Sequence, residues 1–219
     1  MSLKSFGAKI LAKKTVKKIQ RWATNPVETQ ERVFSRLISK AENTQFGIDH
    51  RFAEIASPRD FAEKVPIRDY EDLRSYIESV VAGEEDILWP GKPLYLAKTS
   101  GTTSGAKYIP LTKASMPSHI EAARNALLCY INETENEKFV DGKMIFLQGS
   151  PEMSEKNGIK QGRLSGIVAH FVPGYLLKNR LPSWETNCIE DWETKVDAIV
   201  EETTNEDMTV ISGIHSWVQ

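Results

Sequence analysis

The chain has 219 residues, 40% of them hydrophobic, which is enough to bury a substantial core in one large domain or two small ones. Its 28 basic and 30 acidic side chains give a net charge of -2, which excludes a global field that would recruit nucleic acid or an anionic membrane. Cys129 and Cys188 form neither a disulfide framework nor a metal cluster. No apolar run approaches the roughly 18 residues of a membrane-spanning helix, and the amino terminus has no hydrophobic core of the signal-peptide type. We therefore expect a folded cytoplasmic protein.

Residues 1–24 predict a basic amphipathic helix, which we treat as a segment separate from a main domain over residues 25–219. Seven basic residues precede the first acidic one, Glu28, and the apolar residues between them are Phe6, Ile10, Leu11, Val16, Ile19 and Trp22. We expect the apolar side to dock on the body of the protein while the lysines remain solvated, without stable membrane association. The alternative is an anionic membrane surface, but no lipidation motif supports it.

Three helices are predicted next. Asn25-Pro26 begins the first, whose apolar residues from Val33 to Ala41 recur at helical spacing, and we expect it to end near Phe46-Gly47. Ser57-Pro58 opens a short second helix that Val65-Pro66 stops. Asp69 caps the third, which closes at Gly83. The apolar stripes of these helices are expected to be core positions.

The most informative stretch is a loop between two short apolar strands, expected near residues 94–97 and 108–112. Its sequence, Thr99-Ser-Gly-Thr-Thr-Ser-Gly-Ala-Lys107, offers hydroxyl donors, two glycines that let the backbone approach an anion, and a cation. Such a loop suits a polyphosphate. The spacing of its glycines and lysine fits neither the P-loop motif G-x-x-x-x-G-K-[ST] nor the Rossmann-type dinucleotide-binding motif G-x-G-x-x-G. A flexible Ser/Thr/Gly linker is the alternative, but a linker seldom separates two strand-like runs.

Downstream, Thr112 is expected to cap a helix, and residues 144–147 predict another buried strand followed by Gln148-Gly-Ser. Residues 155–166 contain three glycines and are expected to form a loop that borders the site. Ser165, Gly166 and His170 are candidate substrate contacts; the alternative is a connecting loop whose histidine is satisfied by its neighbours. An acidic helix over residues 190–203 and a strand over residues 208–211 complete the pattern.

The loop resembles the phosphate-binding loop of the adenylate-forming superfamily. The continuation Lys107-Tyr-Ile-Pro-Leu-Thr112, together with Phe61-Ala-Glu-Lys-Val-Pro-Ile-Arg-Asp-Tyr-Glu-Asp72 and Ala82-Gly-Glu84, resembles the auxin-responsive acyl acid–amido synthetase family from about Pro26 onward. The resemblance implies an α/β fold in which amino-terminal helices precede part of a mixed sheet flanked by helices, as in the large domain of adenylate-forming enzymes. It also implies that the loop holds the β- and γ-phosphates of ATP, through these residues: Ser100, Gly101, Thr102, Thr103, Ser104, Gly105 and, at a spacing that differs by one residue, Lys107.

The implied reaction activates a carboxylic acid as an acyl-adenylate and then conjugates it to an amine or amino acid, with Mg²⁺ arriving bound to ATP. The four histidines show no metal or triad spacing, and no nucleic-acid partner is expected. The family's adenine-binding motif, ribose-contacting aspartate and lysine-bearing carboxy-terminal domain have no counterpart here, so we expect the amino-terminal part of such an enzyme, inactive by itself. The alternatives are an inactive remnant or regulatory ATP-binding protein, and an acyl-CoA ligase-like enzyme.

Overall fold

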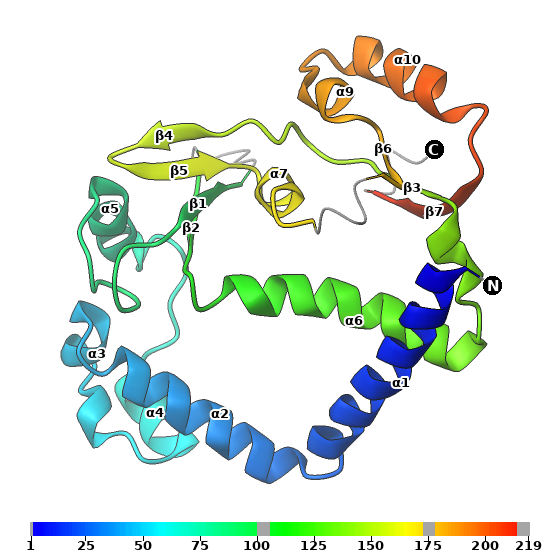
Figure 1. Cartoon of the computed structure of the whole chain (residues 1–219). Coiled ribbons are helices and arrows are strands. Elements are labelled where there is room, and N and C mark those ends of the chain that lie inside the picture. The colour runs from blue at the N-terminus through cyan, green and yellow to red at the C-terminus, as the bar shows by residue number, and fades with distance from the viewer. Residues whose placement is uncertain (1, 100–105, 173–177, 214–219) are drawn as a thin grey trace. The chain divides into compact units, whose positions relative to one another are not determined.

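The computed structural model describes residues 2–99, 106–172 and 178–213, which fall into two compact units. The hairpin unit comprises Gln20–Met116 and Ser154–Gln161, and the parallel-sheet unit comprises Met1–Ile19, Pro117–Met153 and Gly162–Gln219. Each unit contains helices and a sheet of its own (Figure 1). The expected α/β class, with helices preceding the sheet, is confirmed, although the strands form two sheets. The division at residue 24 stays a prediction.

The hairpin unit is built from short helices around a four-stranded sheet in the order β2-β1-β5-β4. Figure 1 shows α5 beside this sheet, and its buried residues Ile77 and Val80 pack with Leu96 of β1 and Ile159 of β5. A second apolar cluster joins α2 to the segment around Phe52. The elements are α2 (Pro26–Ala41), α3 (Gln45–Asp49), η1 (Phe52–Glu54), α4 (Pro58–Lys64), α5 (Arg74–Ala82), β1 (Tyr95–Lys98), β2 (Tyr108–Leu111), β4 (Ser154–Lys156) and β5 (Ile159–Gly162).

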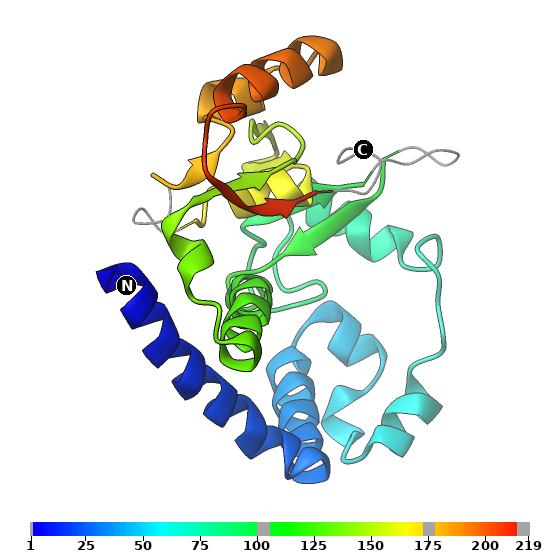
Figure 2. The same ribbon diagram turned by 90° about the vertical axis from the view of Figure 1, so that its right-hand side faces the viewer.

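The parallel-sheet unit has a three-stranded sheet in the order β6-β3-β7, with both outer strands parallel to β3. In Figures 1 and 2, α9 and α10 lie on the same side of this sheet. The elements are most of α1 (Leu3–Ala23) and α6 (Met116–Thr134), then η2 (Lys138–Asp141), β3 (Lys143–Phe146), α7 (Leu164–Ala169), β6 (Arg180–Leu181), α9 (Trp184–Cys188), α10 (Trp192–Thr203) and β7 (Met208–Ser212).

The predicted helix over residues 1–24 is present as α1, but it docks differently from the expectation. Its buried residues are small, and Ala12 packs with Leu128, Ile131 and Phe139. Most of the large side chains that were expected to dock are exposed, including Phe6 at 50% and Ile10 at 55%, whereas Val16 and Ile19 are half-buried. Small residues occupy the buried face because they allow the helix backbone to approach its neighbours closely.

The predicted end of the first helix and the predicted start of the third helix were wrong. In both cases a side chain caps a separate short turn and not the long helix itself. The first helix ends at Ala41, because the hydroxyl of Thr44 accepts a hydrogen bond from the Gly47 N–H (3.0 Å) and starts α3. The third helix begins at Arg74, because the Asp69 carboxylate accepts from the Asp72 N–H (3.0 Å) in a preceding turn. Gly83 does close α5, with φ of 98°.

The apolar stripe of α2 is only partly a core position. Ile38 and Ala41 are buried, whereas Val33 is 37% and Leu37 45% exposed.

The segment expected as a loop over residues 155–166 is a β-hairpin followed by a helix. β4 and β5 pair antiparallel, and Asn157 and Gly158 between them have φ of 52° and 75°. An Asn-Gly pair favours this tight turn, because both central residues need positive φ. The glycine content was interpreted as a loop signal, although Asn-Gly between alternating residues is a hairpin signal.

Candidate functional site

The candidate phosphate-binding segment, residues 100–105, lies outside the described residues, but both strands that flank it are described. β1 and β2 pair antiparallel from Tyr95 opposite Leu111 to Lys98 opposite Tyr108. The pairing continues one step further, where the Thr99 N–H donates to the Lys107 carbonyl oxygen at 3.0 Å. The two strands predicted on either side of the segment are therefore present, and the residues that flank the segment, Thr99 and Lys107, are held together.

Lys107 is the described cation at the end of this segment. Its Nζ lies 5.0 Å from the centroid of the Tyr70 ring, at cation–π distance, and the side chain is partly exposed. Within the described part of the chain, Lys107 makes no ion pair with a carboxylate. Its charge is thus not neutralised locally and can be offered to an anion.

Tyr70 supports the same place from another part of the chain. Its hydroxyl oxygen accepts a hydrogen bond from the Tyr108 N–H at 2.8 Å, which fixes the first residue of β2. Two residues earlier, Arg68 Nη2 donates to His50 Nε2 at 3.0 Å, and His50 Nδ1 donates to the Phe46 carbonyl. The Val65-Pro-Ile-Arg-Asp-Tyr70 stretch, which the sequence offered only as part of a resemblance, therefore positions the base of the loop. Nothing in its local pattern indicated that role.

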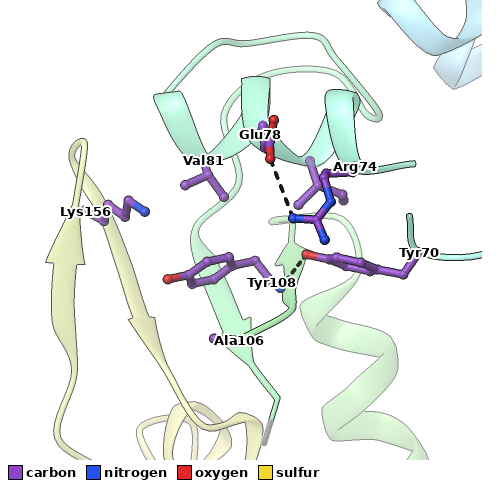
Figure 3. A pocket seen from close by; sticks show the side chains of 8 residues that line it. Tyr70, Arg74, Glu78, Val81, Ala106, Tyr108 and Lys156 are labelled. Atoms are coloured by element: carbon purple, nitrogen blue, oxygen red, sulfur yellow. Dashed lines mark hydrogen bonds and ion pairs between the residues drawn. The ribbon is translucent and has the colours of Figure 1, made fainter. Parts of the chain in front are cut away.

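A pocket of about 170 Å³ lies between α5, the start of β2 and the β4/β5 hairpin. Figure 3 shows Arg74 and Glu78 projecting from α5 toward the rings of Tyr70 and Tyr108, with Lys156 opposite. Arg74 is neutralised by Glu71 and Glu78, and Lys156 Nζ lies 5.3 Å from the centroid of the Tyr108 ring. The volume is below the roughly 300 Å³ at which pockets begin to enclose a whole small ligand. We interpret it as a recess beside the loop.

The three candidate substrate contacts lie at α7 in the parallel-sheet unit. Ser165 is exposed, and Gly166 is buried so closely that an added Cβ would lie 2.4 Å from the Ser150 carbonyl oxygen. His170 Nε2 donates to the Pro151 carbonyl at 2.8 Å, and its ring packs edge-on against Trp184. The structure thus gives Gly166 and His170 packing roles at the segment that follows β3. Their part in substrate binding stays a prediction.

Sequence reasoning missed a group of polar side chains at the carboxyl end of β3. Lys195 of α10 is 4% exposed and donates from Nζ to the carbonyl oxygens of Asn187 (2.7 Å) and Gln148 (3.2 Å). The Arg163 side chain lies across Gly149, since a Cβ placed on that glycine would be 2.6 Å from Arg163 Cδ. The available signal was a lysine inside an apolar stripe, three residues after Trp192 and four before Ile199.

Among the residues that the structure describes, no group of three or more His, Cys, Asp or Glu side chains could hold a metal ion. No helix in the same residues is long and apolar enough to cross a membrane.

The family model described as the GH3 family N-terminal domain matches residues 15–186. Indole-3-acetic acid-amido synthetase GH3.15 of Arabidopsis thaliana is 29% identical over 144 residues, which are 62% of this chain and 23% of that protein. Jasmonoyl–L-amino acid synthetase JAR6 of Nicotiana attenuata is 23% identical over 171 residues, which are 74% of this chain and 28% of that protein. The chain thus spans about a quarter of the length of these relatives.

Two solved structures have the same fold over most of the chain. The GH3.15 acyl acid amido synthetase superposes with a TM-score of 0.63 at 22% identity, covering 80% of this chain and 31% of the other. The AtGH3.15 synthetase in complex with 2,4-DB gives a TM-score of 0.61 at 23% identity, covering 69% and 27%. The family match extends over well more than half of the sequence, from within α1 to within α9. The chain therefore belongs to the GH3 family and corresponds to its N-terminal domain.

Proposed function

We propose that this chain carries the phosphate-binding segment of an ATP-dependent acyl acid–amido synthetase. The observation that carries the proposal is the paired β1 and β2 strands, which hold together the ends of a hydroxyl- and glycine-rich segment with the unneutralised cation of Lys107 beside it. Membership of the GH3 family supports it, because the relatives are amido synthetases by name. The substrates would be a carboxylic acid and an amine or amino acid.

The residues present fit a triphosphate. Ser100, Thr102, Thr103 and Ser104 supply hydroxyl donors, Gly101 and Gly105 allow close backbone approach, and Lys107 supplies a positive charge. Charge-assisted hydrogen bonds of this kind are stronger than neutral ones. Mg²⁺ is proposed to enter bound to the ATP phosphates, as it usually binds through substrate oxygens and few protein ligands.

The proposed chemistry proceeds in two transfers. A carboxylate oxygen of the acid forms a bond to the α-phosphorus of ATP while the bond to the β-phosphate oxygen breaks and pyrophosphate leaves. The amine nitrogen then attacks the activated carbonyl carbon, AMP leaves, and the nitrogen loses a proton. The contribution of this chain is to orient the phosphates and to neutralise their charge as pyrophosphate departs.

ATP binding to the 219-residue chain tests the proposal, measured by calorimetry with Mg²⁺ present. Lys107→Ala should weaken ATP binding by about tenfold, because a charge-assisted contact contributes roughly 1.5–3 kcal/mol. Ser100→Ala should weaken it less. Lys113→Ala is the matched control, since Lys113 is an exposed lysine beyond the end of β2. Equal ATP affinity in Lys107→Ala, Ser100→Ala and wild type would remove the proposal.

The alternatives are separated by a second measurement, made on this chain joined to the remaining domains of a GH3 synthetase, because the amino-terminal part is expected to be inactive by itself. Exchange of labelled pyrophosphate into ATP that depends on an added carboxylic acid would favour the synthetase, whereas ATP binding without exchange would favour a protein that binds nucleotide and has lost the chemistry. Trapping of the activated acid by coenzyme A in preference to an amino acid or hydroxylamine would favour an acyl-CoA ligase.

A further inference from the structure

The carboxyl end of β3 carries two cations that have no counter-charge. Neither Lys195 nor Arg163 forms an ion pair within the described ranges 2–99, 106–172 and 178–213. Lys195 is 4% exposed, so its charge is largely removed from water and held only by two carbonyl oxygens. Charges in such surroundings are normally paired, because desolvation of an isolated ion is costly.

Arg163 is close enough to Lys195 to affect it electrostatically. Burial is the main cause that lowers the pKa of Lys195, and the positive charge of Arg163 lowers it further. Cys188 acts in the opposite direction and raises it. The pKa of the Cys188 thiol is raised chiefly by burial and also by the nearby carboxylates of Glu152 and Glu185. Neither carboxylate makes an ion pair with Lys195 or Arg163 within the described residues. Within the described residues, Lys195 and Arg163 thus lie near each other and neither forms an ion pair with a carboxylate.

A buried donor in the same segment also lacks a partner. Gln148, whose carbonyl oxygen accepts from Lys195, has its side-chain Nε2 buried without a hydrogen bond. Buried amide donors are normally satisfied, since an unmade hydrogen bond costs about 1–3 kcal/mol. Within the described residues this donor is therefore available to a hydrogen-bond acceptor on a ligand.

The location is one at which ligands commonly bind. Gln148 and Gly149 directly follow β3, the central strand of three parallel strands, and ligands of α/β proteins bind outside the carboxyl ends of such strands. Arg163 reaches this end because Gly149 has no side chain to exclude it. Lys195 reaches it from α10.

We propose that Arg163, at the end of β3 that also carries Gln148 and the buried charge of Lys195, binds a carboxylate of a substrate. This inference rests on the proposed function for the choice of a carboxylate over other anions, since both the acyl acid and the amino acid carry one. Arg163 makes the direct contact because it is exposed and has five N–H donors in a planar fork that suits a carboxylate. Lys195 acts as a positioning residue that holds the Gln148 carbonyl.

The test is a titration of the ¹⁵N-labelled 219-residue chain without ATP, followed by NMR at constant ionic strength. Sodium phenylacetate represents the acyl acid, glycine represents the amino acid, and sodium chloride is the reference anion. We expect one of the two carboxylates to shift the Arg163 Nε–H and Gln148 side-chain amide resonances with saturation, and its identity tells which substrate is bound.

Three variants at the site and one control variant make the titration specific. Arg163→Gln should reduce carboxylate affinity by about tenfold, and Arg163→Lys by less, because the charge is kept and the fork is lost. Gly149→Ala should also reduce it, because the new Cβ must displace the Arg163 side chain without changing any charge. Lys138→Gln removes one exposed cation from the same unit and should leave the affinity unchanged.

The proposal is overturned if neither carboxylate shifts these resonances more than chloride does, or if Arg163→Gln binds as tightly as wild type. Failure of the ATP proposal is seen separately, since ATP binding and its Lys107→Ala variant are measured without a carboxylate. If the chain binds ATP but not carboxylate, only the carboxylate proposal is contradicted. If it binds carboxylate but not ATP, only the nucleotide proposal is contradicted.

Discussion

The hairpin of β1 and β2 and the carboxyl end of β3 both carry cations that form no ion pair with a described residue, but the two places are assembled in different ways. At the hairpin, the donors and the cation come from one stretch of nine residues, 99–107. At β3, they come from Gln148, Arg163 and Lys195, which fold together from a segment of 48 residues, 148–195. The first kind of site is visible in a sequence, and the second exists only after folding.

The two places also differ in how tightly they are packed. Lys107 is partly exposed and lies against one ring, whereas Lys195, Gly149 and Gly166 are buried. Substitutions near β3 should therefore cost more stability than substitutions at the base of the hairpin, and four predictions test this difference.

The largest effect is expected for Gly166→Ala. The added Cβ would lie 2.4 Å from the Ser150 carbonyl oxygen and 3.1 Å from Pro151 Cα, which are backbone atoms that cannot move aside cheaply. Overpacking of this kind should lower the free energy of unfolding by about 2 kcal/mol, measured by urea denaturation. Gly7→Ala is the control, because no atom lies within 4 Å of its added Cβ and it lies inside α1. It should raise stability by about 0.5–1 kcal/mol. A neutral Gly166→Ala would mean that α7 does not pack on the β3 segment as described.

Lys195 should make stability depend on pH in the alkaline range. Its pKa lies below the ordinary value of 10.5, chiefly because of burial. Between the lowered folded value and 10.5 the unfolded chain binds more protons than the folded chain, so the free energy of unfolding rises with pH there. One group can give a slope of at most about 1.4 kcal/mol per pH unit.

Urea denaturation of wild type and Lys195→Met from pH 7 to alkaline pH measures this slope, with exposed Lys138→Met as the reference variant. As pH rises, the free energy of unfolding of wild type should increase relative to that of Lys195→Met. A difference between them that stays constant, or that changes in the opposite direction, contradicts the burial of a charged lysine.

At the hairpin, Tyr70→Phe should lower the free energy of unfolding by about 1 kcal/mol, because the Tyr108 N–H loses its acceptor while the ring remains under Lys107. Tyr130→Phe removes an exposed and longer hydrogen bond, 3.3 Å to Asn136, and should cost a few tenths. Equal losses in the two variants would show that Tyr70 does not support β2. Thermal or urea denaturation is sufficient for the comparison.

Control variants aside, the smallest stability effect is expected for Lys107→Met. A cation–π contact at a partly exposed site contributes about 0.5 kcal/mol, so urea denaturation should change little. A loss above about 2 kcal/mol would mean that Lys107 is a structural residue, and its effect on ATP binding could then not be assigned to the charge alone. The pair of measurements, small in stability and large in ATP affinity, is what distinguishes this hairpin from the β3 site.

The sequence by itself determined the features that depend on neighbouring residues. Local turn, cap and periodicity signals predict the two strands that flank residues 99–107, the capped helix after Ser57, the closure of α5 at Gly83 and the helix of residues 1–24. The family was also recognisable from contiguous motifs, because the proposed phosphate-binding segment and the Val65-Pro-Ile-Arg-Asp-Tyr70 stretch are each short and unbroken.

Only the tertiary structure decided which residues from distant segments meet. It put small residues of α1, not its large apolar ones, on the buried face, because the neighbouring surface admits a closely packed helix. It placed Tyr70 beneath Lys107 and brought Arg163 and Lys195 to the end of β3. These contacts depend on long-range packing and on the absence of a side chain at Gly149. The lysine inside the apolar stripe of α10 indicates that Lys195 is unusual, but no local pattern in the sequence names the residues that it meets.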